Sequence, residues 1–381
     1  MFTASTLATG TPEPTSRKNA APADADTVDH DGFDGTIEIP KTDFTIKLDG
    51  YVKVDLIHDF DAIGSTDSFD TSTIPTDGRE GENTRFHAKE SRANLEIRGP
   101  SRRGAVRIFV EGDFFTSDNS FRLRHAYGEV GRLLVGQTWS TFMDEDMRPP
   151  TLDFEAPRTY LNIRQAMIRW TQPLSKAVYL AVALEEPASE ITPPAGVAGE
   201  SEHPLPDLTA RLRWKHERGH LQSSMFVGGV RFRSDAGPID DETIWGLNLS
   251  GSMKAFQGDR LRFQLAYGEG LTRYRGGLAA APDATGRLEA LGAFSATLSY
   301  QHHWSEALST HVVYSLGTID NSAGQDPDAN HATEYAALNL VWKYTERVSI
   351  GAEWLYGTRE DNDGARGEAN RLLVAIRFDF F

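Results

Sequence analysis

Apolar and polar side chains alternate along most of the chain, in runs of about ten residues that are separated by connections. Sixteen such runs can be counted between Phe44 and Phe381. In the first run one alternate set is apolar and the other mostly polar: Phe44, Ile46, Leu48, Val52, Val54 and Leu56 against Thr45, Lys47, Asp49, Tyr51, Lys53 and Asp55. Because successive side chains of a β-strand point to opposite faces, this pattern predicts strands with one apolar face.

The connections between these runs alternate between long and short. The long ones are residues 61–84, 116–120, 143–160, 185–207, 234–242, 269–287, 317–332 and 357–368. The short ones are residues 99–104, 131–132, 172–175, 215–219, 255–259, 302–307 and 343–347. Eight loops and seven turns leave both chain ends on the short-turn side. This layout predicts an all-β fold: a transmembrane up-and-down antiparallel β-barrel of about 16 strands, with long outer loops and short periplasmic turns.

The composition agrees with this fold class. No apolar stretch approaches the roughly 18 residues of a transmembrane helix, whereas a barrel strand needs only half of its residues to be apolar. Cysteine is absent, which excludes disulfides, thiol catalysis and cysteine-ligated metal sites. Since the repeat continues without a linker, we expect one barrel domain at residues 44–381 after a tail at residues 1–43.

The first 40 residues hold seven acids and two bases and show no periodicity. We expect a disordered or extended acidic tail. No signal peptide is evident, so we expect the numbering to start at a processed or truncated N-terminus. Asp29, Asp31 and Asp34 could bind calcium, but they lack the glutamate that an EF-hand loop needs at its twelfth position. The sequence therefore predicts no metal site and no cofactor.

Aromatic residues gather near the strand ends, which is typical of the girdles that meet the two membrane interfaces. They are Tyr127, Trp170, Trp214, Tyr300, Trp304, Trp342, Trp354 and Tyr356. A soluble β-protein with these rings in its core is the alternative. The last strand alternates up to Phe380, and the barrel-assembly machinery is an expected partner because it binds such terminal strands. Phe381 breaks that alternation.

Charges are sorted by location. Residues 185–207 hold six acids and no Lys or Arg, whereas arginines occupy the polar phase of the strands. These arginines are Arg92, Arg98, Arg107, Arg122, Arg124, Arg169, Arg211, Arg213, Arg260, Arg262, Arg371 and Arg377. A guanidinium that faces lipid at mid-membrane costs about 2 to 4 kcal/mol, so we expect these side chains in the lumen. The expected counter-ions are Glu96, Glu111, Asp113 and Glu353. Either the charges are merely paired and solvated, or the lumen attracts anions.

One stretch resembles a known family. Residues 84–155 contain RFHAKESRANLEIRGP, FVEGDFF, FRLRHAYGEVG, LLVGQTWSTFMD and TLDFE, which are similar in wording and order to the DcaP-like family of trimeric outer-membrane porins. The resemblance implies a sixteen-stranded barrel, a homotrimer, and diffusive uptake of small anionic solutes such as dicarboxylates. Members of that family often carry a helical coiled-coil segment before the barrel. The tail here has no heptads, so trimerisation would rest on the barrel walls.

The loop at residues 143–160 follows Gln137, Thr138 and Trp139, and in porin-like barrels this loop commonly folds inward. Its Asp144, Glu145, Asp146 and Asp153 would then face the wall arginines, and the alternative is an exposed acidic loop. Arg122 and Arg124 are the favoured wall residues. The full set expected to line the pore and bind solute is Arg92, Arg107, Arg122, Arg124, Arg169, Arg211, Arg213, Arg260, Arg262, Glu111, Asp113, Asp144 and Asp146.

Other functions fit the sequence less well. The eleven histidines show no HExxH spacing and no GxSxG motif is present, which argues against a membrane-embedded enzyme. A barrel with a plugged lumen and a structural or adhesive role stays open as an alternative. A net charge of -16 argues against nucleic-acid binding. The acidic loops could bind divalent cations that bridge to lipopolysaccharide phosphates, and outer-membrane lipid is an expected neighbour.

Overall fold

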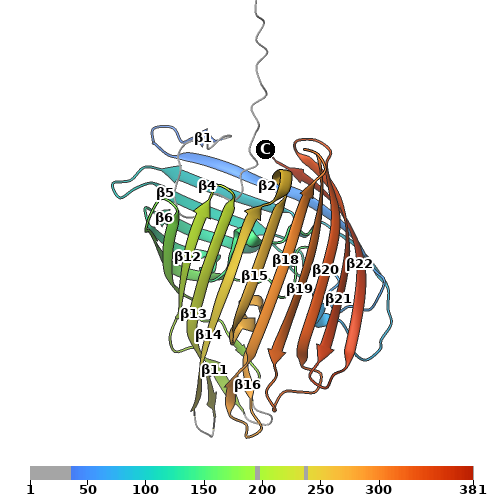
Figure 1. Ribbon diagram of the computed structural model, residues 1–381. Helices are drawn as coiled ribbons and strands as arrows, with labels where there is room; N and C mark the ends of the chain where they lie inside the picture. Colours follow the sequence, from blue (N-terminus) through green and yellow to red (C-terminus); the bar gives the residue numbers. More distant parts are fainter. Residues whose placement is uncertain (1–35, 194–197, 236–238, 381) are drawn as a thin grey trace, which may run out of the picture.

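The computed structural model describes residues 36–193, 198–235 and 239–380. They form one closed antiparallel β-barrel of sixteen strands, as the alternation predicted (Figure 1). The barrel closes where β2 pairs with β22, in a register that runs from Tyr51 opposite Asp379 to Asp59 opposite Arg371. Among the described residues no helix is long and apolar enough to cross a membrane.

The strands follow one another around the barrel in chain order. The first part of the wall contains β2 (Thr45–Asp59), β3 (Asn83–His87) with β4 (Arg92–Gly99), β5 (Val106–Asp113), β6 (Arg122–Val130), β7 (Leu133–Trp139), β8 (Arg164–Pro173) and β9 (Val178–Glu185). The second part contains β12 (Asp207–His216), β13 (Gly219–Ser234), β14 (Ile239–Lys254), β15 (Arg260–Glu269), β18 (Gly292–His303), β19 (Leu308–Asp320), β20 (Asn330–Lys343), β21 (Val348–Asp361) and β22 (Arg366–Asp379).

Shorter elements do not belong to this wall. β1 (Ile37–Glu38) pairs with β2, and β11 (Gly199–Glu202) extends the sheet beside β13. β10 (Glu190–Ile191), β16 (Leu278–Pro282) and β17 (Leu288–Ala290) form a separate small sheet from two loops. The 3-10 turns are η1 (Thr71–Thr73), η2 (Glu145–Met147), η3 (Phe256–Gly258) and η4 (Leu271–Arg275). The expected tail at residues 1–43 lies mostly outside the described residues, as do the Asp29, Asp31 and Asp34 cluster and Phe381.

β3 and β4 share one position in the barrel because both pair with β2. Between them the ladder is interrupted, and Ser91 replaces the missing bonds: its hydroxyl accepts from the amide of Lys53 at 3.1 Å and donates to the Lys53 carbonyl at 3.3 Å. A strand in a bilayer cannot leave such groups unpaired, since no water is present to bind them. The interruption turns Glu90 toward Lys53, with which it forms an ion pair.

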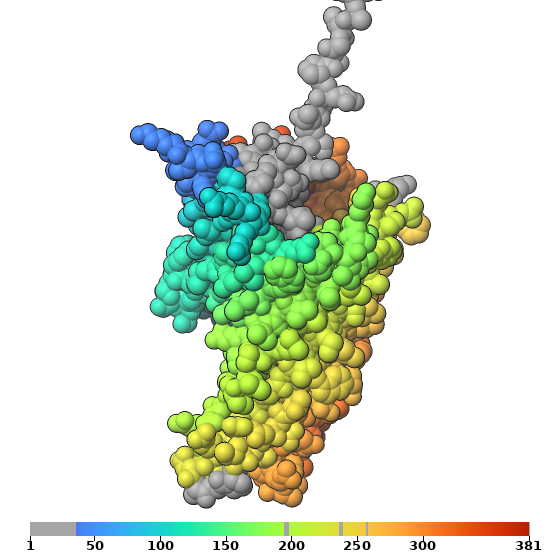
Figure 2. Space-filling model, turned by 90° about the vertical axis from the view of Figure 1, so that its left-hand side faces the viewer, coloured from blue at the N-terminus to red at the C-terminus, as the bar shows by residue number. Residues whose placement is uncertain are grey.

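The two parts of the wall differ in height. β4 to β9 are seven to ten residues long, whereas β13 and β14 have sixteen residues each. In Figure 2 the short strands, in teal, end well above the green and yellow strands that reach the loop side of the molecule. The two ends of the described chain lie together at the opposite, short-turn side (Figure 1).

The expected division between the strand faces is observed. On β2, Leu48, Val52 and Leu56 are exposed on the outside, whereas Lys53 and Asp55 are buried inside the barrel. Most of the predicted girdle aromatics, for example Trp170, are likewise exposed on the outer face. Tyr127 is an exception, because its ring lies in the lumen-facing phase of β6, 5.5 Å from the guanidinium of Arg107.

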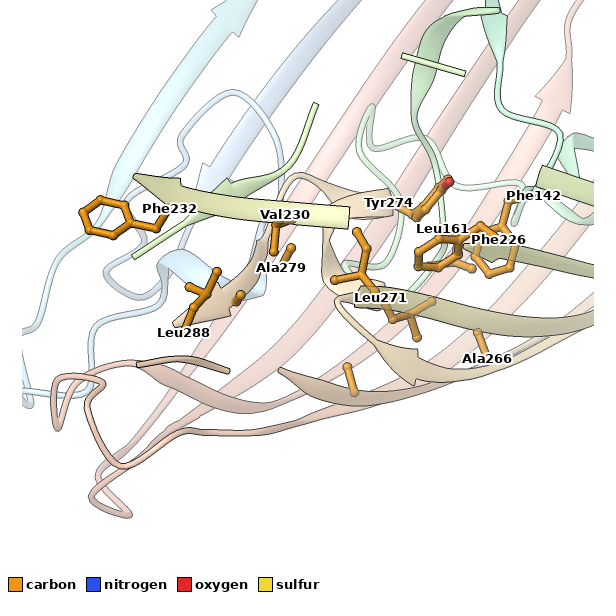
Figure 3. Close-up of a cluster of buried hydrophobic side chains, with 13 residues drawn as sticks. Phe142, Leu161, Phe226, Val230, Phe232, Ala266, Leu271, Tyr274, Ala279 and Leu288 are labelled. Carbon is orange, nitrogen blue, oxygen red and sulfur yellow. The ribbon is translucent and has the colours of Figure 1, made fainter. Parts of the chain in front are cut away.

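Part of the interior is a packed apolar core rather than open space. Phe142 and Leu161, from the loop between β7 and β8, meet Leu271 and Tyr274 of η4 and the inner face of β13 around Phe226 (Figure 3). The rings of Phe142 and Phe226 are 4.9 Å apart. Two long loops therefore enter the barrel and pack against the tall side of its wall.

An arginine on the outer face of β12 should destabilise the barrel. Leu212 is 47% exposed and lies between the inward-facing Arg211 and Arg213. We expect Leu212→Arg to lower the free energy of unfolding by about 2 to 4 kcal/mol, because the new guanidinium faces lipid. Urea titration of the barrel refolded in lipid vesicles measures the loss. Leu212→Ala is the control and should lose less; equal losses for the two variants would contradict the assigned outer face.

A constriction held between opposite walls

The loop between β7 and β8, residues 140–163, is called the constriction loop here. Near its start the carbonyl of Phe142 accepts hydrogen bonds from Ser224 of β13 at 2.5 Å and Asn248 of β14 at 3.1 Å. Further along, the amides of Leu152 and Asp153 donate to Glu353 of β21. The loop thus crosses the lumen from one part of the wall to another, as an inward-folded loop was expected to do.

The first half of the loop is fixed by ion pairs to β12 and β13. Asp144 is fully buried; it accepts from His220 at 2.7 Å and from Ser250 at 2.8 Å, and Arg213 lies 3.6 Å away. Arg213 also binds Asp146. Burial alone would raise the pKa of Asp144, but His220 and Arg213 outweigh it and hold that pKa below its usual range. The carboxylate therefore stays charged and fastens the loop.

Asp144, Asp146 and His220 bring their ligand atoms within 4.8 Å of one another, a spacing that a metal ion could use. The guanidinium of Arg213 binds both carboxylates and supplies the positive charge that a metal ion would otherwise supply. The two carboxylates are therefore balanced by a guanidinium in an ion-pair network, and we assign no metal to them.

The second half of the loop is fixed to β2, β21 and β22. Both carboxylate oxygens of Glu353 accept from the amide of Leu152, at 2.9 and 3.0 Å, and one accepts from the amide of Asp153 at 2.8 Å. The Lys53 ammonium donates to the Leu152 carbonyl at 2.6 Å, and Arg371 lies 3.7 Å from Asp153. The expectation that Glu353 neutralises a wall arginine is wrong. Among the described residues it pairs with no arginine, because loop amides occupy its oxygens.

A cluster of four arginines lines the lumen on β4, β6 and β8. The arginine cluster consists of Arg92, Arg122, Arg124 and Arg164. Arg122 binds Asp113 through two nitrogens, at 2.7 and 3.3 Å. Arg124 bridges Glu111 at 2.9 Å and Asp113 at 2.7 Å, and Arg92 lies 3.4 Å from Glu111. Glu111 and Asp113 are thus the counter-ions, as expected, and three arginines share them.

A β-bulge interrupts β6 at Arg124. The register between β5 and β6 shifts there: Glu111 pairs with His125, whereas Gly112 pairs with Leu123. Arg124 is the extra residue, so the inner side of the wall holds Arg122 and Arg124 together with His125, which a regular strand would place on the other face. Their exposures differ: the side chain of Arg122 is 33% exposed and that of Arg124 only 1%. Arg122 can therefore touch a solute, and Arg124 mainly holds the two carboxylates in place.

Arg164 was not predicted from the sequence. It is the first residue of β8, in the phase of the outward-facing Ala166, Ile168 and Trp170, so the alternation placed it on the lipid side. At this strand end its guanidinium instead lies 4.6 Å from the ring centre of Trp139. Arg124, Arg122 and Asp113 are the charges that act on it most strongly. It has no carboxylate partner among the described residues. Its position directly after an inward-folded loop was the signal that could have identified it.

Flat aromatic surfaces lie beside the cluster. The rings of Phe115 and Phe154 stack 3.8 Å apart at 11°. The guanidinium groups of Arg122 and Arg124 lie 5.3 and 5.7 Å from the Phe154 ring centre, within the range of cation–π attraction. Since Phe154 belongs to the constriction loop, the loop and the arginine wall touch each other here.

The other candidate residues are spread over the wall. Arg107 binds Glu96 at 2.6 Å and lies 3.9 Å from Glu129, and Arg169 and Arg211 occupy inward positions of β8 and β12. On β15, Arg260 donates to Ser252 at 2.9 Å and Arg262 to Gln301 at 3.1 Å. No described carboxylate pairs with either of them, so β15 carries a second uncompensated basic site.

The acids of the constriction loop do not oppose Arg122 and Arg124 as a group. Asp144 and Asp146 pair with Arg213 on the far wall, and Asp153 lies next to Arg371. Glu145 is the acid that interacts electrostatically with Arg124 and Arg92, while its ion-pair partner at 3.8 Å is Arg148 of the loop itself. Asp144, Asp146 and Asp153 therefore face Arg213 and Arg371, which belong to the expected wall arginines, and not the favoured Arg122 and Arg124.

The fastening of the loop can be tested at Glu353. We expect Glu353→Gln to loosen residues 150–153, because a neutral amide accepts more weakly from the two loop amides. Single-channel recordings in a planar bilayer should then show noisier and larger open currents. Glu334→Gln, on the outer face of β20, is the matched control and should behave like the parent. Unchanged noise and conductance in Glu353→Gln would show that this carboxylate does not fasten the loop.

Solved structures with a similar fold were found. The DcaP outer membrane channel of Acinetobacter baumannii matches with a TM-score of 0.80 and 22% identity, over 90% of this chain and 99% of that chain. An anion-selective porin from Comamonas acidovorans matches with a TM-score of 0.61 and 11% identity, over 88% and 100%. OmpT of Vibrio cholerae, as a loop deletion mutant, matches with a TM-score of 0.57 and 11% identity, over 89% and 100%. No match was found among curated protein sequences.

A family model identifies the chain directly. The model of the DcaP outer membrane protein matches residues 30–380, which is nearly the whole chain and includes every barrel strand. This protein therefore belongs to the DcaP family of outer membrane proteins and is a porin-type barrel of the outer membrane.

Proposed function

We propose that this barrel is a passive channel for small hydrophilic anions, in particular dicarboxylates. The observation that carries the proposal is the charge balance of the arginine cluster. The cluster holds four guanidinium groups but only two carboxylates, Glu111 and Asp113, which pair with three of them, so two positive charges are left beside the constriction loop. Confined channels strengthen the field of such a surplus, because little water is present to screen it.

The geometry suits a carboxylate in particular. A guanidinium is planar and offers paired donors that match the two oxygens of a carboxylate. Arg164 has no carboxylate partner among the described residues, and Arg122 is one-third exposed. A solute with two carboxylates could bind both guanidinium groups of this pair. Arg260 and Arg262 on β15 would form the next basic site toward the short-turn side.

Two relatives support the transport role without fixing the solute. The A. baumannii protein is described as an outer membrane channel, and the C. acidovorans porin as anion-selective. A trimer form is described for OmpT of V. cholerae. We extend the proposal to a homotrimer of this chain held by its barrel walls. Binding of the acidic loops to lipopolysaccharide through divalent cations, and of the last strand to the assembly machinery, stay predictions.

A plugged barrel is the competing function, since the apolar core around Phe142 and Tyr274 fills part of the lumen. Conductance decides between the two. The parent protein in a planar bilayer should show stepwise currents, a reversal potential that favours anions under a salt gradient, and block by a small dicarboxylate such as succinate. No current at all would favour the plugged barrel, and a preference for cations would remove the arginine argument.

Replacing Arg122 and Arg124 together should shift the selectivity toward cations. Arg122→Gln with Arg124→Gln leaves Arg92 and Arg164 against Glu111 and Asp113, so the surplus of two positive charges falls to zero. The reversal potential under a salt gradient reports the change. Arg218→Gln, in a short turn outside the lumen, should leave it unaltered. If the double variant kept the parent's reversal potential, these two residues would not belong to the selective region.

Replacing Arg164 should weaken solute binding. Since no described carboxylate pairs with Arg164, the substitution leaves no acid without its partner. We expect Arg164→Gln to raise the dicarboxylate concentration for half-block by at least about tenfold, because a charge-assisted hydrogen bond contributes roughly 1.5 to 3 kcal/mol. Titration of the single-channel current with succinate measures this. Arg164→Lys keeps the positive charge but not the paired donors of the guanidinium, so it should recover only part of the lost affinity for succinate. An unaltered block in Arg164→Gln would contradict direct contact between Arg164 and the solute.

A further inference from the structure

The outer face of the short wall has a groove of about 560 Å³ close to the periplasmic turns. Its apolar lining comes from the outward-facing side chains of three neighbouring strands, namely Val106, Val130, Leu133 and Val135. Gly128 lies in the same outward row of β6, and a Cβ placed on it would meet no atom within 4 Å. A missing side chain therefore creates the groove in a wall that is otherwise covered by large apolar residues.

The turns at the rim of this groove carry only positive charge. The groove itself is bordered by Arg102 and Arg103, and the two following turns along the wall add Arg132 and Lys176. These turns, residues 100–105, 131–132 and 174–177, contain no acid. By contrast, each of the other four periplasmic turns contains one, at Glu217, Asp259, Glu306 and Glu346.

The basic turns adjoin one another. The amide of Gly131 donates to the carbonyl of Ala105 at 3.3 Å, and the amide of Thr171 donates to the carbonyl of Arg132 at 2.9 Å. Arg132 donates to the side-chain oxygen of Gln172 at 2.6 Å. Arg102 and Arg103 have no carboxylate partner within the described ranges. An apolar groove therefore runs directly into a patch of uncompensated cations at the height of the membrane interface.

We propose that this groove binds an anionic phospholipid of the periplasmic leaflet, with an acyl chain along Gly128 and the phosphate on Arg102 and Arg103. The acyl chain would then contact the apolar groove at the depth of the hydrocarbon core, and the headgroup would contact the arginines at the membrane interface. Guanidinium groups are strong phosphate donors. A zwitterionic lipid is the poorer fit, because the basic turns offer its ammonium group no carboxylate and Glu129, which also borders the groove, is buried beside Arg107 on the inner side of the wall. Selectivity for net negative lipid follows from the all-basic rim.

The test uses native mass spectrometry of the full-length barrel in mild detergent, with phosphatidylglycerol and phosphatidylcholine as probes. The parent should retain phosphatidylglycerol in preference to phosphatidylcholine. The triple variant Arg102→Gln, Arg103→Gln, Arg132→Gln should bind phosphatidylglycerol on the order of a hundredfold more weakly, because each basic side chain near an anionic surface contributes roughly fivefold. Arg218→Gln with Arg347→Gln, two arginines of other periplasmic turns, is the matched control and should bind like the parent.

Gly128→Leu tests the part of the site that would bind the acyl chain. The added side chain meets no atom near its Cβ, so it should fill the groove without strain. We expect it to lose bound lipid while its single-channel conductance, which depends on the lumen, stays that of the parent. Equal retention of the two lipids by the parent, or equal retention of phosphatidylglycerol by all variants, would overturn the proposal. A changed oligomeric state in Gly128→Leu with unaltered lipid binding would assign the groove to a second copy of the chain instead.

Discussion

The bilayer core offers no water to hydrogen-bond a backbone amide or carbonyl, and this constraint governs the rest of the molecule. A β-sheet meets it only by closing on itself, which the pairing of β2 with β22 achieves here. Closure divides every strand into a lipid face and a lumen face. Apolar side chains cover most of the first, so most charged side chains at membrane depth are directed into the second. Where the ladder is interrupted between β3 and β4, the Ser91 hydroxyl supplies the missing bonds.

Concentrating charge in the lumen explains how the constriction loop is held. A buried carboxylate without a partner is costly, and each acid of the loop or its wall has a specific donor. Asp144 meets His220 and Arg213, and Glu353 meets the loop amides. The acidic outer loops stand apart from this network. At physiological salt the Debye length is about 8 Å, so charges on loop tips are largely screened before they reach the constriction.

Much of this could be predicted from the sequence because strand faces are a local property. The period of two identifies the strands, their number and the inward phase of Arg92, Arg122 and Glu111. It fails where position depends on contacts between distant segments. Arg164 lies at a strand end, where the alternation no longer holds, and the bulge in β6 brings Tyr127, which was predicted for the outer girdle, to the inner side. The partners of Glu353 and Asp144 depend on the path of a loop about two dozen residues long, which no local pattern encodes.

The pairing of arginines with acids in the cluster has a consequence for transport. A channel must attract its solute strongly enough to admit it and weakly enough to release it. Four unpaired guanidinium groups would hold a dianion too firmly for rapid passage, whereas four fully paired ones would not attract it. Glu111 and Asp113 set an intermediate surplus, and the buried Arg124 holds both of them in place beside the partly exposed Arg122. The acids of this wall are therefore as much a part of the proposed anion path as the arginines, because they limit how tightly each solute is bound.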